Sequence, residues 1–198
     1  YDTAGFHNSI VRGEDITAYY EDGTLWDRIA GINGFKPYED LYLGDYFKMS
    51  RAISANQSVG SQYITIAGFD CMRGKGAGNK LNFNHITCVP GKFRSGSFHF
   101  GYGAMNSNNT TEGGYIGSKM YTTIGAVATE GSTEATATIN QQLYAEFGSH
   151  LKTSKELLSN AINNSGYNRF GINSGCSNNW SWYPCQAVLM SEVEVYGA

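Results

Sequence analysis

The stretches GDYFKMS (Gly44–Ser50) and SQYITIAGFD (Ser61–Asp70) alternate apolar and polar residues along the chain. Alternation with a period of two is the pattern of a half-buried β-strand, because successive side chains point to opposite faces. A further apolar run, Leu81–Val89, follows the glycine-rich residues Gly74–Lys80, which suit a hairpin tip where positive φ is needed. The middle of the chain therefore predicts short antiparallel strands.

The residues before these strands predict helix. Residues 14–31 (EDITAYYEDGTLWDRIAG) read as two short helical turns, with Asp22 as an N-cap and Gly31 as a C-cap. The apolar residues in this range are spaced for one buried helical face, and they are Ile16, Tyr19, Tyr20, Leu25, Trp26 and Ile29.

Further helices are expected in the second half of the chain, over residues 114–128 and 135–147. Residues 154–163 have two interpretations. Thr153 and Glu156 have the spacing of a capping box, which favours a third helix. A strand through the same residues is the competing interpretation, because the segment also contains an apolar pair.

The remaining segments predict loops and a closing strand. Residues 91–109 are rich in Gly, Ser and Asn with interleaved aromatics, so we expect a long ordered loop. Residues 164–181 predict a polar loop, and residues 182–196 predict the closing strand. The apolar residues of that strand change parity near Ser191–Glu192, which indicates a bulge.

Composition supports a folded domain. The chain has 198 residues, of which 41% are hydrophobic and 16% are charged, against about a quarter charged in typical domains. Disordered chains are usually poor in aromatic residues, whereas this one has 14%. We therefore predict a single α+β domain over residues 14–198, with two or three helices and long ordered loops, preceded by a linker segment over residues 1–13.

Charge and hydropathy exclude two classes of partner. The net charge of −3 argues against nucleic acid, which needs a basic patch to neutralise phosphates. No apolar run approaches the ~20 residues of a membrane span, and no signal peptide is visible. We therefore expect neither nucleic-acid binding nor membrane insertion.

The four cysteines leave two interpretations open. No C-x-x-C pair exists, which argues against zinc. Cys176 and Cys185 flank a tryptophan-containing loop and can form a disulfide, and Cys71 and Cys88 flank a glycine-rich turn and can do the same. Buried free thiols are the other interpretation, because free cysteine is among the most buried residue types.

No motif predicts catalysis, a metal or a cofactor. Residues 74–80 lack the G-x-x-x-x-G-K-[ST] order of a phosphate loop, and no G-x-S-x-G elbow is present. The four histidines are scattered away from metal-ligand spacings. Glu192 and Glu194 would share one strand face, and such neighbours reach the carboxyl spacing of a glycosidase by accident.

Aromatic and amide residues near the C-terminus form the candidate binding site. Trp180, Trp182 and Tyr183 stand in an Asn/Ser-rich loop, and flat aromatic faces beside amides suit a sugar ring or a protein partner. Asn178 and Asn179 are candidates for exposed, adaptable contacts. In the alternative interpretation, Trp182 and Tyr183 anchor the last strand in the core.

Five blocks together resemble a family of phage and prophage virion structural proteins found with Gram-positive gut bacteria. The blocks are RGEDITAYYEDGTLWDRIAG (12–31), GDYFKMSRAIS (44–54), MNSNNTTEGGYIGSKMY (105–121), FGSHLKTSKELLSN (147–160) and WSWYPCQAVLMSEVEVYG (180–197). TEGGYIGSKM and LMSEVEVYG are the most specific pieces. That family is similar to the C-type-lectin-like, formylglycine-generating-enzyme-like fold of phage variable proteins.

The resemblance implies a module of the virion surface, such as a tail fibre, a tail tip or a capsid decoration, that displays loops for host attachment. Its implied partners are other virion proteins and copies of itself, as a homo-oligomer, together with host surface glycan. The alternatives are a carbohydrate-binding module using Trp180, Tyr183, Asn178 and Asn179, and a glycan-cleaving enzyme.

Two features of the resemblance limit what carries over. The enzymes of that fold rely on late reactive cysteines, and nothing places Cys176 and Cys185 in that role, so we expect a non-enzymatic protein. Longer relatives continue beyond the last block, and this chain starts at Tyr1 and not at Met. We therefore expect either a processed or excised piece of a longer protein or a shorter variant of the family.

Overall fold

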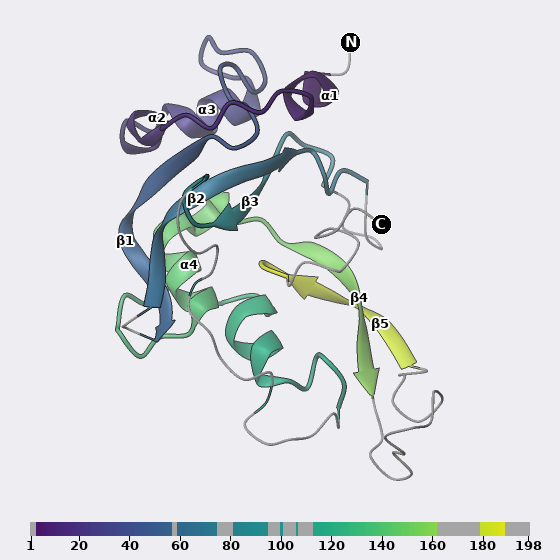
Figure 1. Cartoon of the computed structure of the whole chain (residues 1–198). Helices are drawn as coiled ribbons and strands as arrows, with labels where there is room; N and C mark the ends of the chain where they lie inside the picture. Colours follow the sequence, from purple (N-terminus) through teal and green to yellow (C-terminus); the bar gives the residue numbers. More distant parts are fainter. Residues whose placement is uncertain are drawn as a thin grey trace. The chain divides into compact units, whose positions relative to one another are not determined.

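The computed structural model describes residues 3–56, 59–74, 81–94, 100, 106, 113–161 and 179–188. The chain divides into two compact units. Unit 1 comprises residues 1–75 and 79–102, and unit 2 comprises residues 76–78 and 103–198. Each unit combines helix with antiparallel sheet (Figure 1), so the α+β class is confirmed.

The sheet of unit 1 has three antiparallel strands in the order β1-β2-β3 (Figure 1). The strands are β1 (Tyr46–Asn56), β2 (Val59–Phe69) and β3 (Ile86–Pro90). Phe47 faces Ile64 across β1 and β2, and Ile66 faces Cys88 across β2 and β3. Phe47, Ile64 and Ile66 are all buried, so the alternating pattern correctly predicted the first two strands.

Three short helices belong to the same unit: α1 (Thr3–Asn8), α2 (Thr17–Glu21) and α3 (Thr24–Ala30). The two helices expected within residues 14–31 are present. Gly31 ends α3 with a φ of 73°, as predicted. Asp22 lies one residue before the N-cap Gly23, and its carboxylate accepts a hydrogen bond from the Thr24 N–H at 2.8 Å.

Residues 1–13 are more than the linker that the sequence predicted. They contain α1, in which the His7 ring is buried. The Nδ1 atom of His7 lies 2.6 Å from the carbonyl oxygen of Leu41. The Asn8 amide bonds both the N–H and the C=O of Phe69, at 2.8 and 2.9 Å. The sequence did not indicate these contacts, because the partners are more than thirty residues away and leave no local signal.

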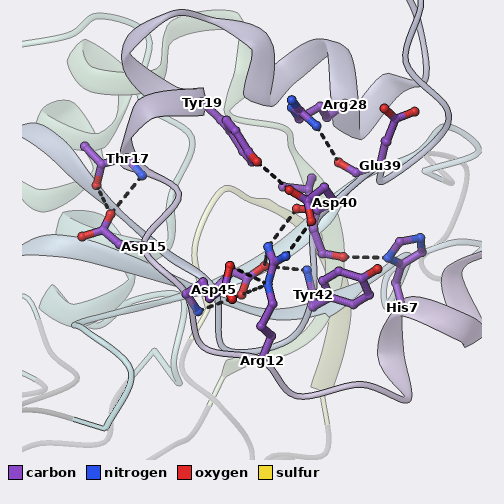
Figure 2. A network of polar contacts seen from close by, with 12 residues as sticks. His7, Arg12, Asp15, Thr17, Tyr19, Arg28, Glu39, Asp40, Tyr42 and Asp45 are labelled. Carbon is purple, nitrogen blue, oxygen red and sulfur yellow. Dashed lines mark hydrogen bonds and ion pairs between the residues drawn. The ribbon is translucent and has the colours of Figure 1, made fainter.

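The start of β1 is fixed by the buried carboxylate of Asp45 (Figure 2). Arg12 donates to it from Nε at 3.1 Å and from Nη2 at 2.7 Å. The backbone N–H groups of Glu14 and Tyr42 donate to the same two oxygens, at 3.0 and 2.8 Å. The charge is therefore both paired and fully hydrogen-bonded, which is the condition for burying a carboxylate.

Arg12 also binds Asp40, whose other oxygen accepts a hydrogen bond from the Tyr19 hydroxyl at 2.5 Å (Figure 2). Burial raises the pKa of Asp40, but the hydrogen bonds from Tyr19 and Arg12 outweigh it and lower that pKa below its ordinary value. Asp40 itself has a φ of 55°. The network therefore holds the turn before β1 in a conformation that few residues adopt.

Two glycines beside this network accept an aromatic ring against their backbone. A Cβ at Gly13 would lie 2.3 Å from Phe93 Cδ1, and one at Gly44 would lie 3.1 Å from the same ring. Both glycines have positive φ, 78° and 82°. Glycine is needed at Gly13 for two separate reasons, the backbone conformation and the space that the ring fills.

Unit 2 contains a π-helical turn, an α-helix, a 3-10 turn and a two-stranded antiparallel sheet. These are η1 (Tyr121–Gly125), α4 (Ile139–Phe147), η2 (Gly148–His150), β4 (Ser154–Ala161) and β5 (Asn179–Cys185). Ile139 and Leu143 bury one face of α4, and the Asn140 amide donates to the carbonyls of Thr122 and Ala126. These two hydrogen bonds connect α4 to η1 and to the residue that follows it.

Several boundaries in unit 2 differ from the predictions. Residues 154–161 form a strand and not the third helix, since they pair along their length with β5. The closing strand begins at Asn179, within the range predicted as a polar loop, and it ends at Cys185. The helix expected over 114–128 is short, because Gly113 and Gly114 have positive φ and Ala126 is already extended.

Other predictions fall outside the described residues. They concern most of the 74–80 glycine cluster and of the 91–109 loop, and the bulge near Ser191–Glu192 with the Glu192 and Glu194 pair. Within the part of the chain that the structure describes, no helix has both the length and the apolar character needed to cross a membrane.

We expect Asp45→Asn to lower the free energy of unfolding by about 3 kcal/mol. The substitution removes the negative charge that is paired with Arg12. It also puts an N–H₂ group where a carboxylate oxygen now accepts hydrogen bonds, so that buried donors face another donor. Urea unfolding of the full chain measures this. Glu14→Gln is the matched control, since its carboxylate lies 3.4 Å from Arg12 but is 65% exposed. That control should change stability by no more than about 0.5 kcal/mol, and equal losses would contradict the assigned role of Asp45.

Gly13→Ala should destabilise the chain more than Gly23→Ala does, by about 1–3 kcal/mol. The two glycines have nearly the same φ, 78° and 82°, but a Cβ at Gly23 meets nothing within 4 Å. The backbone strain is therefore matched, and the difference measures the Phe93 contact. Thermal or urea unfolding provides the readout, and equal effects would show that Phe93 yields without cost.

Candidate functional site

The candidate site is one face of the β4–β5 sheet in unit 2, which we call the aromatic face. Trp182 pairs directly with Leu157, and Pro184 pairs with Lys155. Directly paired residues of antiparallel strands project to the same side. Trp180 lies two residues before Trp182 and so shares that side. The aromatic face therefore combines Trp180, Trp182, Pro184, Leu157 and Lys155.

The large side chains of the aromatic face remain in contact with solvent. Trp180 is 54% exposed, Trp182 46% and Leu157 48%. Single exposed apolar residues are ordinary on protein surfaces, but here three of them are neighbours on one strand pair. A contiguous apolar patch of this kind is a common mark of an interaction site.

The opposite face of the same sheet is packed against other residues of unit 2. Cys185 is buried, and burial, followed by the charge of Glu156, raises the pKa of its thiol to about 11. The Tyr183 ring lies edge-on to the Tyr121 ring, with centroids 6.4 Å apart. Burial also raises the pKa of Tyr121. One face of the sheet is therefore packed, and the two tryptophans lie on the other face, which is exposed to solvent.

The C-terminal end of β5 is held on both of its edges. One edge pairs with β4, and the other meets the segment after η1 through an antiparallel bridge between Ala126 and Cys185. The Gln186 N–H donates to the Gly125 carbonyl at 3.1 Å, and its side chain accepts from the Ala128 N–H at 2.9 Å. The aromatic face therefore rests on a backbone that is fixed from two sides.

The structure places the predicted site residues on different faces of the sheet. Trp180 is exposed, whereas Tyr183 lies on the packed face. Trp182 is not the core anchor of the alternative interpretation, because it is nearly half exposed. Asn179 pairs with Ala161 in the strand, and Asn178 lies outside the described residues.

Sequence reasoning missed Leu157 and Lys155, which join the site from β4. Their contribution depends on the register between two strands that lie more than fifteen residues apart in the sequence. The available signal was the W-x-W spacing at Trp180 and Trp182, which has the period of a strand. It identifies a shared face but not which face is buried.

A second polar cluster, around Asp70 in unit 1, is structural. Its carboxylate accepts hydrogen bonds from the Tyr38 hydroxyl at 2.5 Å and from Arg73 at 2.7 Å. His85 Nε2 accepts from the Met72 N–H, while its Nδ1 faces the Phe83 carbonyl at 2.9 Å. Both ring nitrogens of His85 are therefore occupied by groups of the protein. Every member already has a partner within the protein.

Metal and disulfide chemistry were also compared with the structure. Where residues are described, no three His, Cys, Asp or Glu side chains gather into a group that could hold a metal ion. Cys71, Cys88 and Cys185 are free thiols, and Cys176 lies outside the described residues. Cys185 is buried as the free-thiol interpretation predicts, whereas Cys71 and Cys88 are exposed.

The assignment of faces predicts a contrast between neighbours. Tyr183→Ala should lower the free energy of unfolding by about 1–2 kcal/mol more than Trp182→Ala, although tryptophan is the larger side chain, because only Tyr183 packs against Tyr121. Urea unfolding of both variants measures the difference. A larger loss for Trp182→Ala would mean that the tryptophan side is the buried one.

Comparisons of this chain with protein-family models, with curated proteins and with solved structures give no match.

Proposed function

We propose that this chain is a non-enzymatic structural module of a phage virion surface, which attaches to its target through the aromatic face of β4 and β5. The observation that carries the attachment role is the pair of solvent-exposed tryptophans on a sheet whose other side is packed. The virion context is supported by the sequence blocks that resemble phage structural proteins.

Physical chemistry favours a contact role for the aromatic face. Keeping Trp180, Trp182 and Leu157 in water costs free energy, which is recovered when a ligand covers them. Tryptophan is enriched among residues that dominate binding energy, because one rigid side chain offers a large flat area. An exposed tryptophan pair on a fixed backbone is therefore well suited to bind without prior ordering.

The proposal extends to the setting of the module. As a tail-fibre, tail-tip or capsid-decoration domain, it would stand on the outside of the particle and contact other virion proteins and copies of itself. A C-type-lectin-like architecture is proposed for the chain, because its sequence blocks resemble a family that is similar to that fold. The mixed helices and short sheets of the two units are compatible with it.

The test combines location and attachment. Purified particles should contain the polypeptide on their surface when imaged by cryo-electron microscopy. Particles carrying the double variant Trp180→Ala/Trp182→Ala should assemble normally but adsorb to host cells at least about tenfold less, since two contact side chains are removed.

Ile32→Ala is the matched control for adsorption, because Ile32 is a 52% exposed apolar residue of unit 1. It should leave adsorption unchanged. Particles without the polypeptide would overturn the virion setting. Normal adsorption of the double variant would overturn the assigned contact surface.

A further inference from the structure

We infer that the ligand of the aromatic face is a linear polysaccharide that lies along β5 with its sugar rings stacked on Trp180 and Trp182. This inference rests on the proposed attachment function and names the class of ligand. It differs from the site that the sequence suggested, because Trp182 replaces Tyr183 as the second stacking residue and β4 contributes Leu157 and Lys155.

The spacing of the two indoles suits a chain of rings. Residues two apart on a strand are separated by about 6.8 Å along its axis, which is on the order of one sugar unit. Leu157 lies beside Trp182 as its partner on β4, and Pro184 lies two residues after Trp182 on β5. The apolar surface therefore continues beside and beyond the indole of Trp182. The C–H faces of successive sugars can therefore contact successive side chains.

The size of the aromatic face argues against a protein partner. An aromatic side chain buries about 150–250 Å² when it is fully covered, and about half of each tryptophan is already covered here. The two tryptophans and Leu157 therefore offer roughly 300 Å², whereas a stable protein interface takes about 800 Å² from each partner. A few sugar rings match the available area, and a second copy of the chain does not.

The polar surroundings are compatible with sugar hydroxyls and with acidic substituents. Lys155 shares the aromatic face through its pairing with Pro184 and supplies ammonium N–H donors. Glu156 projects to the other side, where its carboxylate accepts a hydrogen bond from the Ser154 hydroxyl at 2.8 Å. Among the described side chains of the aromatic face there is no carboxylate, so an acidic sugar would meet a cation without a facing negative charge.

The experiment titrates the full chain with three soluble hexamers, which are cellohexaose, chitohexaose and hexagalacturonate, and follows tryptophan emission and calorimetric heat. At least one hexamer should bind. Trp180→Ala and Trp182→Ala should each weaken that binding about three- to tenfold, and Lys155→Ala should weaken hexagalacturonate more than the two hexamers without acidic groups.

Tyr183→Phe is the control on the packed face of the same strand, and it should leave the affinity unchanged while keeping the ring contact with Tyr121. Urea unfolding of each variant separates loss of binding from loss of fold. Absence of binding by all three hexamers would overturn the inference, and so would binding that both tryptophan variants retain in full.

Failure of this inference is distinguishable from failure of the proposed function. If the tryptophan variants abolish adsorption to cells while no hexamer binds the chain, the attachment surface stands and the polysaccharide is replaced by another ligand. If a hexamer binds through the tryptophans while adsorption is unaffected, the ligand class stands and the attachment role falls.

Discussion

The buried carboxylate of Asp45 is the interaction on which the rest of unit 1 depends. It joins the N-terminal segment, through Arg12 and the Glu14 N–H, to the turn before β1, through the Tyr42 N–H. The N-terminal segment meets the start of β1 in isolated parallel bridges, which pair Val11 with Leu43 and Asp15 with Tyr46. An isolated carboxylate at this depth would cost several kcal/mol, so only this complete set of donors makes the arrangement stable.

The same need for complete satisfaction explains why the polar clusters of unit 1 are unsuited to ligands. Asp45 and Asp70 each have their oxygens occupied by donors from the protein itself. A ligand would have to displace a charge-assisted hydrogen bond to reach them, and such bonds are among the strongest in proteins. Neither carboxylate therefore has a free oxygen to offer to a ligand, whereas the aromatic face of unit 2 is apolar and exposed.

In unit 2 the deciding constraint is the parity of β5. Cys185 and Tyr183 occupy the packed side, so strand geometry sends Trp182 and Trp180 to the solvent. A shift of one residue would exchange the two sets and bury both tryptophans. Attachment through the aromatic face, as proposed, thus depends on the packing of residues that never touch the ligand.

The sequence by itself determined the α+β class, the strands β1 and β2, the helices within residues 14–31 and the C-cap at Gly31, because these follow from periodicity and backbone preference within a few residues. It also named Trp180 as a candidate binding residue, and the exposure of that side chain came from the structure. Only the tertiary structure decided that residues 154–161 are strand, that α1 docks on β2 and that Trp182 faces solvent while Tyr183 does not. Each of these features depends on partners that are distant in sequence. A local pattern shows which residues of a strand share a face, but it does not show which of the two faces is buried.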